Sequence, residues 1–357
     1  MKLSHVIRVK SFSDRFDIIE DVGKGTYGEV HKCRDKVTGE IVATKKVFFL
    51  RKEEGLPINT VREGSILFNL KHENIVELKA VVQTEENSQE GTYLVFEYCK
   101  YDLYALLYTP DVEQINVRLM KSLMKQFMVS LHFCAINKVV HRDLKPANMF
   151  ITEKNILKLG DFGLSRKIDL LGKYSAKVIT QWYRPPELLL GCNEYGQEID
   201  IWSAGCILYE MATAKILFHS KRSDDELSQL AIIFDICGIP SDDVLSKYSE
   251  YPNHSLIDKF RFTQRYSSLP RIFERMDQSN YSGLSDLLMK MLQYDPRKRI
   301  TAEQALNHEF FRKIDSSYDP LNIPPLEREE MHQKTASEKK NEKKKLEMAI
   351  ANRPENK

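Results

Sequence analysis

The sequence predicts a two-lobed α+β protein with a small antiparallel β-rich front and a larger, mainly α-helical back. Strand-like segments with glycine punctuation come first, and segments with helical periodicity follow. The 357 residues are 42% hydrophobic and 29% charged, which is typical of a globular protein and excludes collagen-like and wholly disordered classes. The formal net charge of +2 provides no broad basic face, so we expect no direct binding to nucleic acid.

The front of the chain mixes β-branched and polar residues in short segments. Residues 16–22, 29–34 and 41–47 form a three-strand antiparallel pattern, and residues 92–97 form another strand. Pro57 begins a helix whose apolar residues recur at helical spacing. We expect residues 1–15 to be an N-terminal extension.

The back of the chain is helical. Helices are predicted over residues 117–137, 199–214, 226–237, 284–292 and 302–306. The helix over 199–214 is apolar on most faces, so it should be buried. It is too short to span a membrane and carries two acidic residues, so no membrane association is expected.

The ends of the chain and the cysteines indicate its compartment. The N-terminus lacks the apolar core of a secretory signal, and the six cysteines form no C-x-x-C pair, so a reducing intracellular compartment is expected. Residues 312–357 contain several prolines and then mostly charged residues. They cannot bury enough apolar area to offset the entropy lost on ordering, so we expect a flexible tail.

A glycine-rich segment lies between the first two predicted strands. Gly23–Val30 follows the pattern G-x-G-x-x-G-x-V, and its glycines would let the backbone approach phosphate oxygens closely. Taken alone it could be a hairpin turn. Lys45, on the third strand, can pair with phosphates, and Glu63 in the following helix is a carboxylate that can hold this lysine.

The segment His141–Asn148 is the strongest chemical signal. Asp143 can orient an attacking hydroxyl and accept its proton, and Lys145 can stabilise charge on a transferred phosphoryl group. Asn148 and Asp161, the latter at the start of Asp-Phe-Gly, offer oxygen ligands to magnesium. No Cys/His or Ser/His nucleophile arrangement competes with this set.

With these motifs in order, the chain resembles a eukaryotic protein kinase over residues 16–311. The resemblance implies a bilobal kinase fold with an N-lobe (16–97), a hinge (97–102) and a C-lobe (103–311). It implies Ser/Thr specificity from Lys145, an ion pair between Glu187 and Arg299, and a buried Asp200 that holds the catalytic loop. It also implies ATP and magnesium as cofactors.

The same resemblance implies a nucleotide site. Phe96 would lie at its back, Glu97 and Cys99 would bond adenine through the backbone, Asp102 would face the ribose and Phe150 would form the floor. The complete set of expected ATP-binding residues is Val22, Gly23, Lys24, Gly25, Thr26, Tyr27, Gly28, Val30, Ala43, Lys45, Phe96, Glu97, Cys99, Asp102 and Phe150. Thr26 and Tyr27 also match sites of inhibitory phosphorylation in some relatives.

The helix that begins Pro57–Glu63 resembles the cyclin-binding helix of cyclin-dependent kinases, in particular the transcriptional members. A cyclin partner is implied, which would dock Glu63 against Lys45, so the isolated chain is expected to be nearly inactive. Ser175 lies where the family usually has a threonine phosphorylated by an activating kinase. Arg62, Arg142 and Arg166 match the arginines that gather around this phosphate, and three unpaired cations would be unfavourable without an anion.

Target selection is implied by the same segment. Val178 and Ile179, with Arg184, match the shallow pocket for a proline that follows the target residue, so Ser/Thr-Pro substrates are expected. Gln181 replaces a more usual leucine.

The leading hypothesis is a nuclear cyclin-dependent kinase that phosphorylates the C-terminal repeats of RNA polymerase II in transcription elongation. A cell-cycle kinase of the same family is the alternative, and a catalytically dead cyclin-binding scaffold is a third. The third is disfavoured because Lys45, Asp143 and Asp161 are all present.

Overall fold

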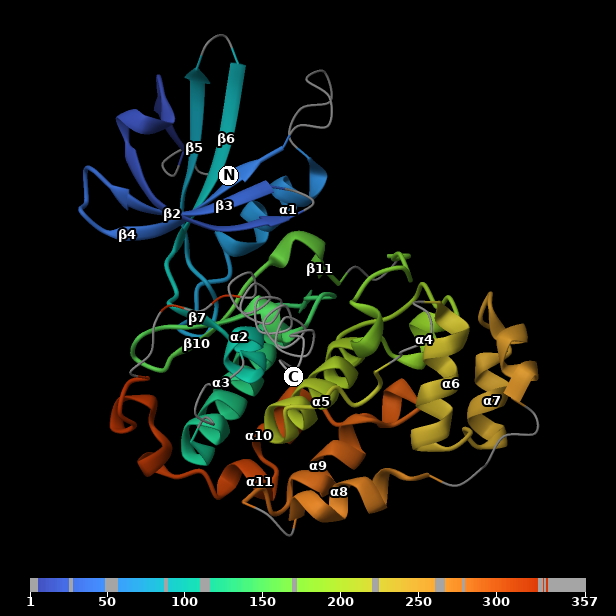
Figure 1. Ribbon diagram of the computed structural model, residues 1–357. Helices are drawn as coiled ribbons and strands as arrows, with labels where there is room; N and C mark the ends of the chain where they lie inside the picture. The colour runs from blue at the N-terminus through green and yellow to red at the C-terminus, as the bar shows by residue number, and fades with distance from the viewer. Residues whose placement is uncertain are drawn as a thin grey trace, which may run out of the picture. The chain divides into compact units, whose positions relative to one another are not determined.

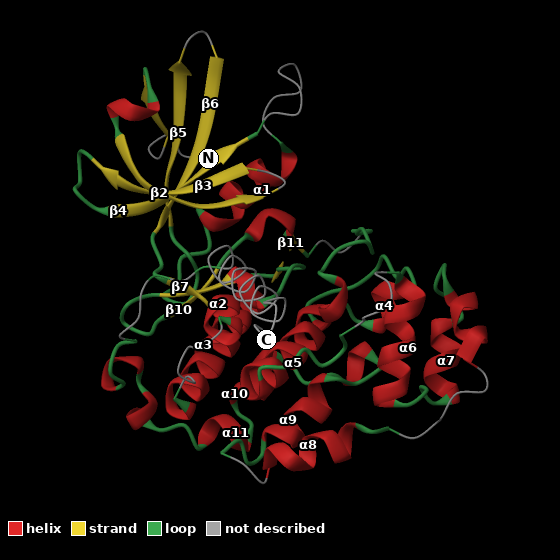
Figure 2. Ribbon diagram, viewed as in Figure 1, coloured by secondary structure: helices red, strands yellow, loops and turns green. Residues whose placement is uncertain are grey.

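The structure is a computed structural model that describes residues 6–25, 28–48, 57–86, 89–109, 116–168, 172–219, 225–260, 267–277, 280–326, 330 and 332. The chain forms two compact units (Figure 1). The first consists of Met1–Ile115, Pro146–Gly163 and Pro324–Lys357, and the second of Asn116–Lys145 and Leu164–Ile323. Strands dominate the first unit and helices the second (Figure 2), so the predicted α+β class is correct.

The first unit is built on a six-stranded sheet of order β1-β5-β6-β4-β3-β2. Neighbouring strands are antiparallel except for β1 and β5, which are parallel. The strands are β1 (Val6–Val9), β2 (Phe16–Gly25), β3 (Gly28–Asp35), β4 (Ile41–Val47), β5 (Leu78–Glu86) and β6 (Gln89–Glu97). The predicted strands correspond to β2, β3, β4 and β6, whereas β1 and β5 were missed.

The described part of the N-terminal extension contributes a strand to this sheet. β1 pairs with β5, and Phe12 in the short 3-10 helix η2 (Phe12–Asp14) is buried. The Phe12 ring stacks on Tyr93 and Phe16, with centroid distances of 4.3 and 5.1 Å. Burial of these aromatic rings explains why a segment without a clear strand pattern is ordered.

A second, smaller sheet also belongs to the first unit, in the order β10-β9-β7. The remaining elements of the unit are α1 (Ile58–Leu67), β7 (Tyr101–Asp102), α2 (Leu103–Tyr108), η4 (Pro146–Asn148), β9 (Met149–Ile151) and β10 (Leu157–Leu159). The sequence prediction places the hinge at residues 97–102. Two segments beyond it, residues 103–115 and 146–163, group with the strands.

The second unit is organised around α5 (Glu198–Thr213), which packs against α3 and α9. Trp202, Ile207 and Leu208 of α5 are fully buried, as its apolar composition predicted. Its other elements are α3 (Val117–Ile136), β8 (Val139–Val140), η5 (Phe162–Leu164, which begins in the first unit), β11 (Arg166–Lys167), η6 (Gln181–Tyr183), α4 (Pro186–Leu189), α6 (Glu226–Cys237), α7 (Asp242–Tyr248), η7 (His254–Phe260), α8 (Leu269–Asp277), α9 (Leu284–Met291), η8 (Pro296–Lys298), α10 (Ala302–Leu306) and α11 (Glu309–Arg312).

The predicted helix that begins at Pro57 corresponds to α1, and the other predicted helices agree with α3, α5, α6, α9 and α10 to within about one residue at each end. The helices α2, α4, α7, α8 and α11 were missed. Of these, α4 and α11 have four residues each, which is too few for a periodic pattern. In the described part of the chain, no helix is both long enough and apolar enough to cross a membrane.

The beginning of the expected flexible tail is packed. Ile314 and Ile323 are buried, and the short 3-10 helices η9 (Ser316–Tyr318) and η10 (Pro320–Asn322) lie between them. Lys125 of α3 donates to the Ile314 carbonyl at 3.0 Å. Two apolar anchors thus hold a stretch whose overall composition indicated none, and the charged residues 333–357 lie outside the described residues.

Candidate functional site

The described residues of the glycine-rich segment lie at the end of β2 and the start of β3. Gly23 pairs with Val30 and Gly25 with Gly28 across the hairpin. A Cβ atom on Gly28 would lie 2.1 Å from the Lys46 carbonyl oxygen, so only glycine fits at this position. Thr26 and Tyr27, expected to contact ATP and to be inhibitory phosphorylation sites, lie outside the described residues.

Lys45 lies between two carboxylates. Its Nζ is 2.9 Å from Glu63 Oε2 in α1 and 3.5 Å from Asp161 Oδ1. Burial opposes the charge on the amine, but the two carboxylates outweigh this effect and raise the pKa of Lys45. Burial raises the pKa of Glu63, which is 3% exposed, while Lys45 acts in the opposite direction. The ion pair expected from the sequence is therefore present, with a third member.

The oxygen ligands expected for magnesium belong to the same unit as Lys45. The Gly160 N–H donates to the Asn148 carbonyl at 3.0 Å, which ties the segment before Asp161 to the end of η4. Asp161 has a positive φ of 57°, and the next residue, Phe162, is fully buried and anchors the turn. An amide oxygen and a carboxylate are oxygen donors of the kind that Mg²⁺ prefers.

No cluster of three or more His, Cys, Asp or Glu side chains that could hold a metal ion occurs among the described residues. Magnesium in phosphoryl-transfer sites takes one or two protein oxygens and completes its shell with phosphate and water. Asn148 and Asp161 fit that donor set.

The expected adenine-site residues also lie in the first unit. Ala43 is paired with Phe96 across β4 and β6, and Asp102 is paired with Phe150 across β7 and β9. Cys99 is buried, and its burial raises the pKa of the thiol. Val22 and Val30 are partly buried on the first hairpin.

The Asp102 carboxylate has a structural contact as well. Its Oδ1 accepts from the Ala105 N–H at 2.7 Å and so caps the N-terminus of α2. This cap fixes the orientation of the side chain that the resemblance places beside the ribose.

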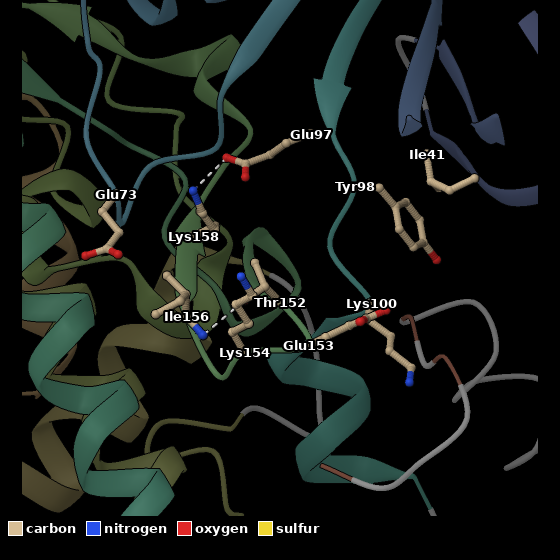
Figure 3. Close-up of a pocket in the computed structure, with 10 residues that line it drawn as sticks. All are labelled: Ile41, Glu73, Glu97, Tyr98, Lys100, Thr152, Glu153, Lys154, Ile156 and Lys158. Atoms are coloured by element: carbon tan, nitrogen blue, oxygen red, sulfur yellow. Dashed lines mark hydrogen bonds and ion pairs between the residues drawn. The ribbon is translucent and has the colours of Figure 1, made fainter. Parts of the chain in front are cut away.

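A cavity of about 410 Å³ is lined by residues of the expected hinge and of the loop between β9 and β10 (Figure 3). Glu97 lines it and pairs with Lys158 at 2.9 Å, while Ile41 and Tyr98 lie on another side. Of the expected ATP-binding residues that the structure describes, only Glu97 lines this cavity. It is therefore distinct from the expected adenine site.

Residues of the C-terminal segment contact the expected hinge, which sequence reasoning missed. Tyr98 Oη donates to Glu330 Oε2 at 2.7 Å, and Glu330 also pairs with Lys32 of β3. His332 Nδ1 lies 3.9 Å from Asp102 Oδ2. Burial lowers the pKa of His332 to about 4, so the ring is neutral near pH 7. Isolated polar residues in a charged segment carry no periodic signal that could have revealed these contacts.

Asp143 and Lys145 lie in the second unit. Lys145 Nζ is 2.7 Å from Asp143 Oδ2, and Thr180 Oγ1 donates to Asp143 Oδ1 at 3.3 Å. Asp143 is only 7% exposed, so these donors satisfy and orient a nearly buried carboxyl group.

Asp200 of α5 holds the backbone of the loop that carries Asp143. Its two carboxylate oxygens accept the backbone N–H groups of His141 at 2.7 Å and Arg142 at 3.0 Å. Burial raises the pKa of Asp200, while the nearby His141 ring and these N–H donors act against that rise. Arg142 has a positive φ of 68°, which is an unfavourable backbone conformation for a non-glycine residue. The two hydrogen bonds to Asp200 hold the backbone in this conformation.

The segment around Ser175 is connected to Arg142 through a tyrosine. Tyr195 Oη donates to the Ser175 carbonyl at 2.6 Å and accepts from Arg142 Nη1 at 3.0 Å. Arg142 Nε also donates to the Leu164 carbonyl at 2.8 Å. Arg62, in the first unit, donates to Asn59 Oδ1 at 2.7 Å and to the Gly163 carbonyl at 3.3 Å.

Backbone carbonyls and neighbouring side chains accept N–H groups of Arg62 and Arg142. The expected role of the three arginines around a phosphate on Ser175 stays a prediction. Arg166 is partly buried in β11, where its backbone lies opposite Val140 of β8 in the strand register. Arg142, Arg166 and Ser175 belong to the second unit.

The expected proline pocket has an unusual backbone. Ile179 has a φ of 66°, which is strained for a β-branched residue. Arg184 Nε donates to the Val178 carbonyl at 2.8 Å, and Arg184 Nη2 donates to the Ile179 carbonyl at 2.9 Å. Both apolar side chains are buried, and burial lowers the pKa of Arg184.

Glu187 and Arg299 form the predicted ion pair at the base of this segment. Arg299 Nη1 and Nη2 lie 2.6 and 2.8 Å from Glu187 Oε1 and Oε2. The Arg299 guanidinium also lies over the Trp202 ring, 5.1 Å from its centroid. This bidentate pair joins α4 to the segment after α9.

Comparison with known proteins gives the class that this fold and site define. The family model described as a protein kinase domain matches residues 16–311. The chain belongs to the protein kinase family, and the predicted kinase fold, with a β-rich N-lobe and a helical C-lobe, is confirmed.

Two relatives indicate a narrower class within this family. Cyclin-dependent kinase C-1 of Arabidopsis thaliana is 38% identical over 328 residues, which is 88% of this chain and 63% of the relative. Cyclin-dependent kinase C-1 of Oryza sativa subsp. japonica is 38% identical over 329 residues, which is 88% of this chain and 62% of the relative. The chain thus spans less than two thirds of the length of these relatives.

Among solved structures, a chain in the crystal structure of the yeast RNA Pol II CTD kinase CTDK-1 complex is similar, with a TM-score of 0.76 and 33% identity. The similarity covers 86% of this chain and 96% of that chain. The resemblance to cyclin-dependent kinases of the transcriptional branch is therefore confirmed.

Proposed function

We propose that this chain is the catalytic subunit of a cyclin-dependent Ser/Thr kinase that transfers the γ-phosphate of ATP to Ser/Thr-Pro sites. The observation that carries the proposal is the Lys45 amine held 2.9 Å from the buried carboxylate of Glu63 and 3.5 Å from Asp161. A charged amine in this position neutralises phosphate oxygens, which is the main requirement of phosphoryl transfer.

The remaining groups have complementary roles in this proposal. The backbone of the glycine turn would cover the phosphates, while Asn148 and Asp161 would hold magnesium, which supplies charge neutralisation when bound. Asp143 would orient the substrate hydroxyl and accept its proton. Lys145, 2.7 Å from Asp143, would lie beside the transferred phosphoryl group.

The preference for proline has a physical basis in Arg184. Its guanidinium donates hydrogen bonds to the carbonyls of Val178 and Ile179, so these two acceptors are not available to a substrate N–H. A non-proline residue after the target would bring an N–H that lacks an acceptor, at a cost of about 1–3 kcal/mol. Proline has no N–H and avoids this cost.

A cyclin would bind at α1. Ile58 and Val61 are apolar residues on this helix, and they are 68% and 48% exposed. Apolar side chains exposed next to each other on one helix are typical of a protein interface. Because Glu63 lies on the same helix, a partner that holds α1 would also hold the ion pair with Lys45.

The proposed substrate is the C-terminal repeat domain of RNA polymerase II, in the nucleus, because the similar yeast structure is an RNA Pol II CTD kinase. The test is transfer of labelled phosphate from ATP to a Ser-Pro repeat peptide by the purified cyclin complex. The Asp143→Asn variant is the control. Transfer by wild type and loss in Asp143→Asn supports the proposal, and equal transfer by both contradicts it.

A further inference from the structure

The turn that carries the expected proline pocket is joined to the start of α6 at two points. Gln181 Nε2 donates to the Asp225 carbonyl at 2.6 Å, at the beginning of η6. Arg184 Nη1 lies 3.9 Å from Glu226 Oε1, at the end of η6. Asp225 and Glu226 are the N-cap and the first residue of α6, so one helix terminus holds both ends of the turn.

The start of α6 is itself held firmly. Asp225 Oδ1 accepts from the Ser228 N–H at 2.8 Å, and Ser228 Oγ donates to Asp225 Oδ2 at 3.0 Å. Gln229, which is fully buried, donates to the Phe218 carbonyl at 3.0 Å. α4 and α6 lie side by side (Figure 1), so the first turn of α6 is a rigid support for the turn beside it.

A leucine at position 181, as the family more usually has, could not donate to the Asp225 carbonyl. The Gln181 amide therefore adds a bond between the pocket and α6. We propose that Gln181 is a positioning residue which, by holding this turn on α6, sets how strictly the kinase selects proline after its target. The inference rests on the proposed function and deepens it.

The bond acts through Arg184. The strained φ of Ile179 keeps its carbonyl on the Arg184 guanidinium, and that arrangement depends on the distance between residues 179 and 184. When the Gln181–Asp225 bond is lost, the turn can relax and the Ile179 carbonyl can rotate. It then accepts the N–H of a non-proline residue, which lowers the discrimination.

The test compares kcat/KM for a Ser-Pro peptide with kcat/KM for the same peptide carrying Ser-Ala, for each enzyme in its cyclin complex. We expect Gln181→Leu to lower the ratio about tenfold, mainly through faster reaction of the Ser-Ala peptide. Gln181→Glu should lower it further, because a carboxylate would meet the Asp225 carbonyl oxygen. A purely structural role would lower both rates in the same proportion and leave the ratio unchanged.

Gln293→Leu is the matched control. Gln293 Nε2 donates to the Met289 carbonyl at the same 2.6 Å, but it follows α9 and lies outside the turn. It should retain the wild-type ratio. Where Gln181→Leu does not fold, judged by circular dichroism, Gln181→Met replaces it, since it also lacks the donor and is unbranched.

The outcomes separate the two proposals. A wild-type enzyme that prefers Ser-Pro, with Gln181 variants that keep the same ratio, overturns the role of Gln181 alone. A wild-type enzyme that phosphorylates both peptides equally overturns the proposed substrate class and the role of Gln181 together. A ratio that falls in the Gln181 variants and not in Gln293→Leu supports the inference.

Discussion

The Arg299 guanidinium donates two hydrogen bonds to the Glu187 carboxylate, at 2.6 and 2.8 Å, and both side chains are at most 1% exposed. A buried pair of this kind is strongly destabilising to break, because the remaining charge loses its partner without regaining water. The pair is thus a structural bond between two parts of the chain that lie 112 positions apart.

Glu187→Gln should lower the free energy of unfolding by about 3–5 kcal/mol, because the buried Arg299 loses its counter-charge. Denaturant unfolding followed by fluorescence measures this. The exposed pair between Lys313 and Glu309 provides the control, and Glu309→Gln should not measurably shift the unfolding midpoint. Similar midpoints for Glu187→Gln and wild type would show that the pair contributes little.

Lys45→Met should reduce phosphate transfer by about 100-fold or more, since the phosphates lose a charged donor. The fold should be retained, because without the lysine the buried Glu63 carboxyl can take up a proton and become neutral. Transfer assays and circular dichroism on the same preparation test both statements. Substantial remaining turnover would contradict the role of Lys45.

Replacing Ile58 and Val61 with Asp should weaken cyclin binding by at least about tenfold without loss of folding, because both side chains are exposed on α1. Calorimetric titration with the cyclin measures the affinity. Ile136→Asp is the control, since Ile136 is 62% exposed near the end of α3. Equal weakening by the control would mean that the effect is not specific to α1.

Ser175→Ala should lower the activity of the cyclin complex, because a phosphate on Ser175 would no longer order the segment. Tyr195→Phe should give a smaller loss, since it removes only the hydroxyl that connects Arg142 to the Ser175 carbonyl. Peptide phosphorylation rates after treatment with an activating kinase test both. Full activity of Ser175→Ala would exclude activation through this residue.

Asp295 should make stability depend on pH in the acid range. Burial would raise the pKa of Asp295, but hydrogen bonds from Lys247 Nζ at 2.6 Å and from Arg297 lower it to about 2. Because the folded pKa lies below the unfolded value of about 3.9, this stabilisation is complete above about pH 4 and is lost as the pH falls toward 2. Unfolding of Asp295→Asn, which keeps an N-cap, should lack this part of the acid dependence.

Much of this fold can be predicted from the sequence alone. Long periodic segments such as α3 and α5, the strands β2 to β4, and the motifs around Lys45 and Asp143 carry their own local signals. The chemistry of these motifs can also be predicted from residue type, because the proposed roles in binding phosphate and magnesium and in orienting the hydroxyl require an amine, an amide or a carboxylate.

Other features arise from contacts between distant segments, which have no local signature. β1 pairs with β5, Phe12 in η2 stacks on Tyr93, about eighty residues away, and Tyr195 contacts Arg142 from another loop. Glu330 meets Tyr98 across 232 positions. Such pairings depend on how the backbone folds back on itself, since neighbours in space are set by packing and not by the order of residues along the chain.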